Sequence, residues 1–262
     1  MKTGYIETEA VVLNTLDYGE SDRIITFYTR EFGKLSGIAK GAKRSRKRFV
    51  GNLDPLCNVK FMFFNNPKRD LLRLDDAVLL NGFNNIRSDI DHLAVGSYFI
   101  ELLNEMSAEE NRNEKVYGLL LHYLKILNDP DFDIDGIKRE ILSRAYEVKL
   151  MAFLGFMPNL DCCVSCRESY MESEKIFFSS LRGGIVCRSC VANAGTVIGI
   201  SKDSAFFMSR VLKSSADDAV EIEVTAPVVE ESGRVLYDFI THQTGKELKT
   251  KKFMEKIAAP WI

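Results

Sequence analysis

Five of the six cysteines lie in one stretch of the chain, residues 162–190. Cys163 and Cys166 form one C-x-x-C pair, Cys187 and Cys190 form a second, and twenty residues separate the two pairs. This spacing is close to that of four-cysteine zinc sites, in which each C-x-x-C turn directs two thiolates at one ion. Because four thiolates complete a tetrahedral shell and leave no position for water, we expect one structural Zn²⁺ per chain and no catalytic metal.

The remaining cysteines have simpler interpretations. Cys162 directly precedes the first pair and is out of frame with it, so we expect it to be a bystander. Cys57 stands in a strand-rich region without a partner and is expected to pack in the core. Redox-active pairs and buried spare thiols are alternatives for the cluster, but two pairs in tandem favour zinc.

A second group of residues that could do chemistry is a run of positive charge near the N-terminus. The chain as a whole carries a formal net charge of −2, and no acidic residue occurs from Phe32 to Leu53. Residues 1–80 contain 14 Lys and Arg against 10 Asp and Glu, a balance of +4, which leaves −6 for the rest of the chain. The run consists of Lys40, Lys43, Arg44, Arg46, Lys47 and Arg48.

Such a run is often only a solvated loop, but its surroundings favour nucleic acid. It has no local counter-charge, and Gly41, Ala42 and Ser45 predict a flexible loop that can follow a phosphate backbone. Cations beside aromatic side chains that stack on bases are typical of single-strand binding. The candidate aromatic residues in the flanking strands are Phe27, Tyr28, Phe61, Phe63 and Phe64.

No motif of a known active site is present in the sequence. There is no phosphate-binding loop, no dinucleotide-binding fingerprint and no nucleophile elbow. His92, His122 and His242 lie far from the cysteines and in no H-x-E or H-E-x-x-H motif. We therefore predict that the protein is not an enzyme.

The elements that would position these residues change from strands to helices along the chain. Short β-branched or alternating segments separated by turn residues predict a small five-stranded barrel, either an OB-fold or an SH3-like barrel. The expected strands are residues 7–15, 23–29, 34–40, 58–64 and 71–80.

From residue 83 onward the hydrophobic period is helical. A first helix is expected after Ser88 as N-cap, and a further helix should end at Gly155. Two more are expected at Ser201–Lys213 and about Pro227–Thr241. The clearest amphipathic stripe comprises Val116, Leu119, Leu120, Tyr123, Leu124 and Leu127.

Composition places the chain among ordinary globular proteins, with 46% hydrophobic and 27% charged residues. No apolar run of about 18 residues occurs, so no transmembrane helix is expected. The apolar run near the N-terminus is too short for a signal peptide. A cytoplasmic location follows, and with it reduced or metal-bound cysteines.

Several segments of the sequence resemble one protein family. The N-terminal block EAVVLNTLDYGESDRIITFYTREFGKLSGIAKGAKRSRKRFVGNLDP resembles the N-terminal domain of the bacterial DNA repair protein RecO family. The segments LMAFLGFMPNLDCCVSC, FFSSLRGGIVCRSC and GKELKTKKFM are similar to later blocks of that family, in the same order. The resemblance covers nearly the whole chain.

The resemblance implies an OB-fold at residues 1–81 and a helical domain at residues 82–262, with a zinc-binding insertion at about 158–195. The family's basic loop falls on the six cations from Lys40 to Arg48, and its zinc ligands fall on the four paired cysteines. It implies a non-enzymatic, nucleoid-associated protein of recombinational repair that binds single- and double-stranded DNA and anneals complementary strands without ATP.

The same resemblance implies protein partners. RecR is expected to act with the protein in loading RecA onto DNA coated by single-stranded DNA-binding protein, whose acidic C-terminal tail is a further partner. From charge alone, Lys138, Arg139 and Arg144 are candidates to receive that tail. The alternative function is an RNA-binding OB-fold and zinc-ribbon protein of translation or transcription, since no residue visibly reads the 2′-hydroxyl.

Overall fold

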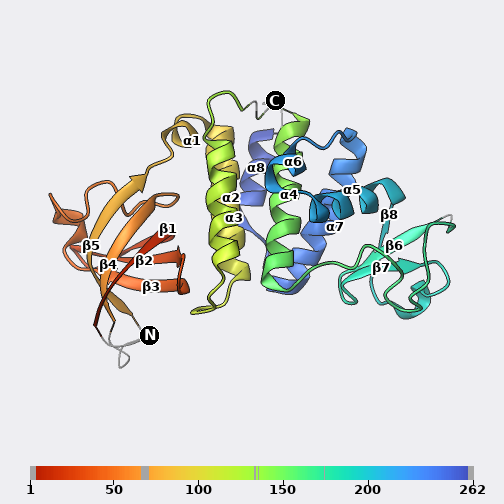
Figure 1. Cartoon of the computed structure of the whole chain (residues 1–262), viewed down its shortest axis with the longest axis horizontal. Coiled ribbons are helices and arrows are strands. Elements are labelled where there is room, and N and C mark those ends of the chain that lie inside the picture. Colours follow the sequence, from red (N-terminus) through yellow and green to blue (C-terminus); the bar gives the residue numbers. More distant parts are fainter. Residues whose placement is uncertain (1–3, 66–70, 133, 135, 174, 259–262) are drawn as a thin grey trace. The chain divides into compact units, whose positions relative to one another are not determined.

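The structure is a computed structural model that describes residues 4–65, 71–132, 134, 136–173 and 175–258 (Figure 1). The chain forms two compact units, one containing residues 1–132 and 253–262 and the other residues 133–252. In the described part of the chain, no helix combines the length and apolar character that crossing a membrane requires.

The first unit begins with a closed five-stranded barrel whose order is β1-β2-β3-β5-β4. All neighbouring strands are antiparallel except β3 and β5, which pair in parallel. This Greek-key order is that of the OB-fold, so the sequence prediction is confirmed and the SH3-like alternative is not. The strands are β1 (Gly4–Tyr18), β2 (Asp22–Thr29), β3 (Gly33–Ala39), β4 (Asn58–Asn65) and β5 (Leu72–Asn81).

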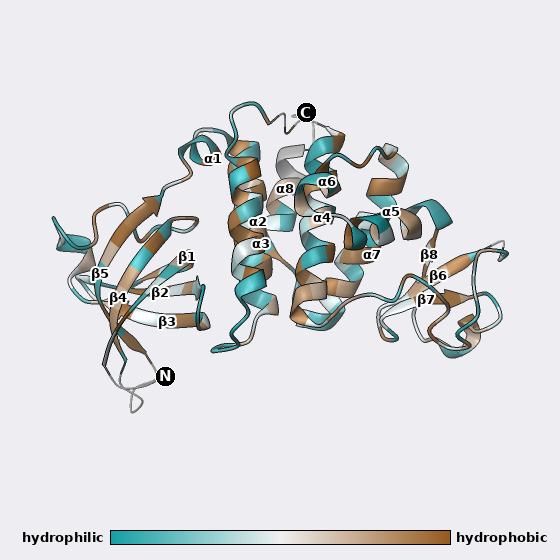
Figure 2. Ribbon diagram, in the orientation of Figure 1, coloured by the Kyte–Doolittle hydropathy of each residue, from teal (hydrophilic) through white to brown (hydrophobic). Residues whose placement is uncertain are grey.

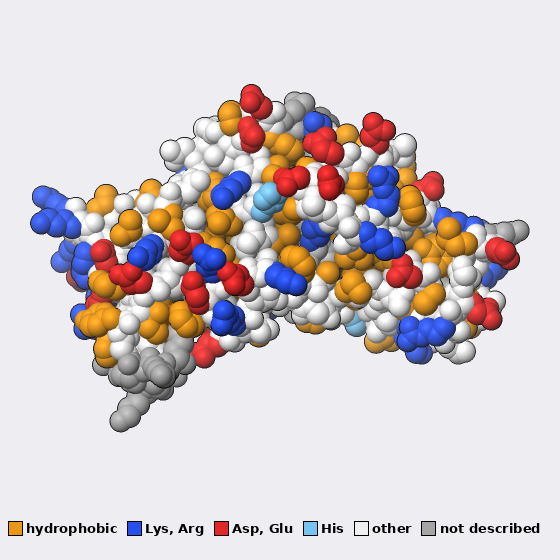
Figure 3. Space-filling view, in the orientation of Figure 1, with side chains coloured by type: hydrophobic (Ala, Val, Ile, Leu, Met, Phe, Trp, Pro, Cys, Tyr) orange, Lys and Arg blue, Asp and Glu red, His pale blue; other side chains and the backbone are white. Residues whose placement is uncertain are grey.

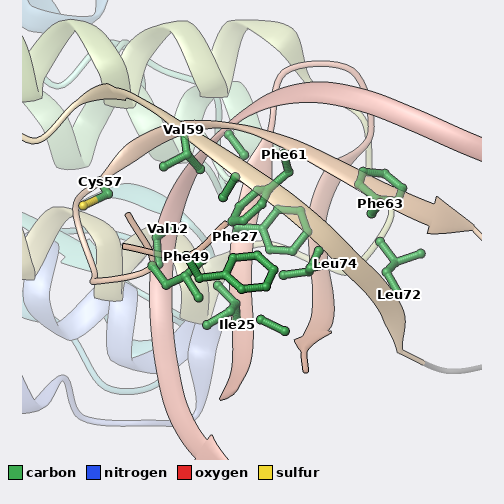
Figure 4. Packing of buried hydrophobic residues seen from close by; sticks show 14 of the residues in the cluster. Val12, Ile25, Phe27, Phe49, Cys57, Val59, Phe61, Phe63, Leu72 and Leu74 are labelled. Carbon is green, nitrogen blue, oxygen red and sulfur yellow. The ribbon is translucent and has the colours of Figure 1, made fainter. Parts of the chain in front are cut away.

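The barrel is held together by side chains that alternate inward along each strand. Figure 4 shows Phe27 and Phe61 packed against each other inside it, with their ring centroids 4.6 Å apart. The parallel contact between β3 and β5 requires a glycine, because a Cβ on Gly37 would lie 2.8 Å from the side chain of Leu74. Cys57 is buried at the edge of this core, as predicted.

Three helices follow the barrel in the first unit: α1 (Asn84–Ser88), α2 (Ile90–Met106) and α3 (Glu114–Leu127). The predicted stripe of α3 is buried along its whole length. The predicted N-cap at Ser88 is wrong. Asp89 caps α2 instead, because its carboxylate accepts hydrogen bonds from the backbone N–H groups of Asp91 and His92.

The second unit combines helices with a small three-stranded sheet. Its sheet has the order β7-β6-β8. Both predicted C-terminal helices are present, and Gly245 ends α7 in a left-handed conformation. The elements are α4 (Ile137–Leu154), β6 (Ile176–Ser179), β7 (Gly184–Cys187), β8 (Ile198–Ile200), α5 (Lys202–Lys213), α6 (Ala216–Val220) and α7 (Ala226–Thr244).

The long helices carry both hydrophobic and hydrophilic residues, as expected for helices with one buried face (Figure 2). A last helix, α8 (Lys249–Ala258), spans the boundary between the two units.

The compact units group α1, α2 and α3 with the barrel. The division into domains of residues 1–81 and 82–262 stays a prediction.

Candidate nucleic-acid interface and metal centre

The six cations of the basic run lie in the loop that connects β3 to β4, and all of them are exposed. In Figure 3, Lys and Arg side chains gather at the outer end of the barrel, with acidic side chains nearby. The loop opens with a short 3-10 turn, η1 (Ala42–Arg44), preceded by Gly41 in the left-handed conformation at φ 68°. The sequence therefore places its positive charge on an accessible part of the barrel.

This loop is anchored rather than free, which limits the flexibility expected from its small residues. The backbone N–H of Gly41 donates to Oδ1 of Asp22 at 2.8 Å, and the N–H of Lys43 donates to the carbonyl of Ser21 at 2.9 Å. Ala42 and Phe49 are buried in the barrel core. Both ends of the cationic segment are thus held by the barrel.

The prediction that the run has no local counter-charge is wrong. The end of β1 and the turn that follows it bring acids beside the run: Lys43 pairs with Asp17 at 3.0 Å, and Arg44 approaches Glu20 at 3.8 Å. The hydrogen bond from Lys43 lowers the pKa of Asp17 below its ordinary value. These acids lie about twenty residues before the loop, so local sequence could not reveal them.

Of the other four cations, one is held by hydrogen bonds and three have no ion pair with a described residue. The guanidinium of Arg48 donates to the carbonyls of Asp75 and Lys40 and lies 5.0 Å from the ring centroid of Phe49. No ion pair with a described residue involves the side chains of Lys40, Arg46 or Lys47. Those three cations are the ones most available to a polyanion.

The aromatic residues proposed from the sequence to stack on bases do not form a surface. Phe27, Tyr28, Phe61 and Phe63 are fully buried inside the barrel or against the helices. Phe64 is half-buried and packs edge-on against Tyr5, at 5.2 Å between ring centroids. Tyr18, at the end of β1, lies exposed near the loop, and it was not among the aromatic residues predicted from the sequence.

The four paired cysteines converge in the second unit. Their sulfur atoms all lie within 4.8 Å of one another, and the Sγ atoms of Cys166 and Cys187 are 3.8 Å apart. A tetrahedral ion with Zn–S bonds of about 2.3 Å requires sulfur atoms about 3.8 Å from one another. The four cysteines can therefore hold a metal ion, and their spacing fits a tetrahedral thiolate site.

Local structure explains why the pairs meet. The hairpin of β6 and β7 carries Cys187 at its end, and the turn containing Cys163 packs on it through Val186 and Ala194. The backbone approaches closely here, since a Cβ on Gly184 would lie 2.5 Å from the carbonyl oxygen of Asn159. A β6–β7 hairpin thus lies between the two pairs, with β8 as an additional strand beside β6.

Hydrogen bonding prepares one of these thiols for deprotonation. Burial raises the pKa of Cys163, but backbone N–H groups, those of Cys166 and Cys187 foremost, outweigh it and lower that pKa to about 6. The N–H of Cys187 lies 3.4 Å from the sulfur of Cys163. A hydrogen bond with Cys187, together with burial, raises the pKa of Cys190 to about 12. Thiolate at Cys163 is the state that a metal ion requires.

Of two other sequence-derived candidates, one has the position expected and the other does not. Cys162 lies outside the four-sulfur cluster and has Asn159 as its neighbour, in agreement with the bystander interpretation. Arg144 cannot receive an acidic tail at the surface, because it is buried and pairs with buried Glu147 at 2.7 Å. The hydrophobic period placed Arg144 on a helix, but it could not show that this side of the helix is buried.

An OB barrel with an exposed cationic loop, followed by a helical unit that holds four clustered cysteines, defines a class of OB-fold proteins with a cysteine metal site. The chain belongs to the recombination protein O family. The profile of the family's N-terminal part (Recombination protein O N terminal) matches residues 1–83, and that of its C-terminal part (Recombination protein O C terminal) matches residues 87–252.

Relatives agree with this assignment over nearly their full length. The DNA repair protein RecO of Syntrophus aciditrophicus is 34% identical over 96% of this chain and 95% of that protein. The DNA repair protein RecO of Thermoanaerobacter sp. is 31% identical, covering 96% of this chain and 98% of that protein. The corresponding protein of Caldanaerobacter subterraneus is 29% identical over 97% and 99%.

Proposed function

We propose that the protein is a DNA-binding mediator of recombinational repair that acts without catalysing a covalent reaction. The observation that carries this proposal is its membership of the recombination protein O family along nearly the whole chain. The exposed loop from Lys40 to Arg48 on the OB barrel supports DNA as the ligand, since OB-folds bind oligonucleotides through their loops and strand faces.

Binding begins with phosphates. Lys40, Arg46 and Lys47 are free to displace counterions from a nucleic-acid backbone, whereas Lys43 and Arg44 must first exchange their acidic partners. Phosphate contacts position a strand without reading its sequence, so the loop accepts single- and double-stranded DNA alike. The bound DNA gives the protein a cytoplasmic, nucleoid-associated location.

From this binding mode we derive strand annealing without ATP. Two complementary strands repel each other through their phosphates, and a cationic surface that neutralises both allows their bases to pair. Base pairing itself supplies the free energy. The chain carries no phosphate-binding loop motif that would couple annealing to nucleotide hydrolysis.

The metal site is structural in this proposal. Cys163, Cys166, Cys187 and Cys190 would hold one Zn²⁺ per chain, which when bound cross-links the two C-x-x-C turns. The chain's own contribution is to bring the turns together through the β6–β7 hairpin and to aim backbone N–H groups at Cys163. The site stabilises the second unit and contacts no DNA.

The proposed partners follow the family. The protein would act with RecR to load RecA onto DNA coated by single-stranded DNA-binding protein, and it would contact the acidic C-terminal tail of the latter. Lys138 and Arg139 remain candidates for that tail, whereas buried Arg144 is withdrawn. The RNA-binding alternative gains no support from the family assignment.

Fluorescence anisotropy titrations with one sequence as single-stranded DNA, duplex DNA and RNA test the proposal. We expect both DNA forms to bind, with a slope of log K against log salt on single strands of about −2 to −4, for about three to six phosphate contacts. A preference for RNA of about tenfold or more would favour the alternative function, because it would require contacts with the 2′-hydroxyl.

A further inference from the structure

A groove of about 210 Å³, here called the α5 groove, lies in the second unit between α5 and the segment that joins α6 to α7 (Figure 1). One wall is formed by Asp203, Phe206, Phe207 and Arg210 of α5. These residues stand at positions i, i+3, i+4 and i+7, so they share one side of the helix. Phe207 is buried, whereas Phe206 is 61% exposed. The sequence of α5 therefore places a large aromatic side chain where the groove meets solvent.

The other wall of the α5 groove is residues 222–225, followed by Val228 of α7. These four residues belong to no helix or strand, and Thr225 is extended, with φ −84° and ψ 152°. The backbone N–H and C=O groups of Ile222, Glu223 and Val224 make no hydrogen bond with a described residue. Free main-chain groups beside an apolar groove can pair with an extended peptide, as the edge of a sheet does in β-augmentation.

Acidic side chains gather at the α5 groove. Residues 214–233 contain six Asp and Glu and no Lys or Arg. Asp203 and Glu223 line the groove and are exposed, and exposed Glu221 directly precedes its second wall. None of these three carboxylates forms an ion pair with a described residue. The groove therefore presents negative charge that a ligand can neutralise.

The three cations of α5 compensate little of this charge. Lys202 donates to the backbone carbonyl of Met171, and Lys213 pairs with Asp161 at 3.7 Å. Both of these partners lie outside the groove lining. Arg210 does line the groove, where its guanidinium lies 6.0 Å from the centroid of the exposed aromatic ring. Two acids thus face one cation within the lining.

We propose that the α5 groove docks an extended basic segment of a protein partner. One large apolar side chain of that segment packs against Phe206 and Val224, and its main chain pairs with the free backbone groups of residues 222–224. Lysine or arginine side chains two residues to either side of the apolar one lie beside Asp203 and Glu223. This interaction surface goes beyond the proposed function and uses no residue of the basic loop.

Charge and spacing select the class of partner. Side chains alternate along an extended peptide, so residues i−2, i and i+2 face the same way. An apolar residue flanked at these positions by cations matches an apolar groove bordered by acids, whereas an acidic tail would be repelled. Main-chain hydrogen bonds supply affinity for any extended segment, and the groove and its acids supply specificity.

The probe is a fluorescein-labelled heptapeptide with a central leucine, a lysine two residues to each side of it and threonines elsewhere. Anisotropy titration with the full-length protein should give saturable binding that weakens as the salt concentration rises. Replacing both lysines with glutamates, or the leucine with serine, should weaken binding about tenfold or more. Methylating the backbone nitrogens beside the leucine should also weaken binding, because it removes main-chain donors.

Two variants of the protein test the proposed contacts. Phe206→Ser removes an exposed side chain and should weaken binding of the leucine peptide about tenfold, but not that of the serine peptide. Asp203→Asn/Glu223→Gln should weaken binding of the lysine peptide about threefold to tenfold and flatten its salt dependence. Bound peptide should slow hydrogen exchange of the amides of residues 222–224.

Matched controls lie outside the groove lining. Met157→Ser removes a side chain that is also 61% exposed, and it should bind the leucine peptide as wild type does. Asp131→Asn/Glu172→Gln removes two exposed acids and should likewise change no affinity.

Three outcomes would overturn the inference: no saturable binding, equal weakening by Met157→Ser and Phe206→Ser, or tighter binding of the glutamate peptide. The last of these would show that the groove takes acidic segments. The titrations contain no DNA, so these outcomes leave the proposed DNA binding standing. Failure of DNA binding would in turn leave the docking of a basic segment standing.

Discussion

Lys40, Arg46 and Lys47 differ from Lys43 and Arg44 because no described acid pairs with their side chains. Replacing the three unpaired residues with Ala should flatten the slope of log K against log salt on single strands by about 2, at about 0.7 per lost contact. Salt-dependent anisotropy titrations measure this slope.

The matched control is Lys60→Ala, which removes a cation of β4 that pairs with Glu7 outside the loop. Its slope should equal that of the wild type. A triple variant with an unchanged slope would mean that the loop is only solvated charge.

Asp22 fixes the start of the cationic loop, so its removal tests how far the anchoring matters. The Asp22→Ala variant should speed hydrogen exchange of the Gly41 amide about threefold or more, because that amide loses its acceptor. Glu20→Ala removes an acid from the same turn without touching this bond and should leave the exchange unchanged. Equal exchange in all three proteins would contradict the anchor.

The anchor also has a pH dependence of known sign. The hydrogen bond from the Gly41 backbone holds the pKa of Asp22 below its ordinary value of 3.8. A depressed folded-state pKa stabilises the loop at pH above the ordinary value, and this stabilisation is lost as pH falls through the folded-state pKa. The difference between Asp22→Ala and wild type should therefore persist from neutral pH to about pH 5 and disappear in stronger acid.

At the residue scale, the sequence was enough to locate the cations, but not to predict which acids lie beside them. The run from Lys40 to Arg48 is visible because its members are adjacent. Asp17 and Asp22 reach it only through the β1–β2 hairpin, which no local pattern reports. The buried aromatic residues were misjudged, because alternation alone does not say which set of side chains faces inward.

Among the elements, the β6–β7 hairpin and its two cysteine turns are the ones that a bound ion would cross-link. Protein purified without chelator should contain about one zinc per chain, and Cys187→Ser should lose it, because three sulfur ligands remain. Cys162→Ser is the matched control and should keep the metal, since Cys162 lies outside the cluster. Metal analysis and limited proteolysis within residues 160–195 measure both effects.

Full zinc content in a variant that lacks all four clustered cysteines would contradict the assignment. Loss of zinc from Cys162→Ser would show instead that the ligand frame is shifted by one residue.

Helix packing in the second unit depends on a glycine. A Cβ on Gly233 of α7 would collide with the guanidinium of Arg144 on α4, which pairs with buried Glu147. Gly233→Ala should therefore destabilise this unit by about 3–5 kcal/mol, the usual cost of breaking a buried pair. Urea denaturation followed by circular dichroism measures the change.

Gly118→Ala is the opposite case, because nothing lies within 4 Å of a Cβ at that position of α3. It should stabilise the protein by up to about 1 kcal/mol. Equal stability of Gly233→Ala and wild type would mean that Arg144 can move aside without losing its partner.

Element types were predictable where the hydrophobic period was regular. The stripe of α3 follows from local sequence, and so does the presence of α5 and α7. The third strand, β8, was missed because its three residues are too short to show a period. The cap of α2 was misplaced by one residue because Ser88 and Asp89 are both good N-caps.

At the scale of the whole molecule, the order of β barrel, helices and cysteine cluster followed from sequence, and the family assignment agrees with it. The grouping of the first three helices with the barrel was harder to predict. The helices belong to the first unit because β3 contacts α2 and the segment after it. Nζ of Lys34 in β3 donates to the carbonyl of Asn104 in α2 at 2.7 Å, and the N–H of Glu110 donates to the carbonyl of Lys34 at 3.0 Å. Such long-range contacts leave no periodic signal.

Strand annealing tests the central claim most directly. Complementary strands, one carrying a fluorophore and the other a quencher, are mixed with the wild type or the Lys40→Ala/Arg46→Ala/Lys47→Ala variant, with and without ATP. The account predicts annealing faster than the spontaneous rate, equal in the presence and absence of ATP, and lost in the variant because the phosphates are no longer neutralised. Annealing at the spontaneous rate with wild-type protein, or acceleration that requires ATP, would contradict it.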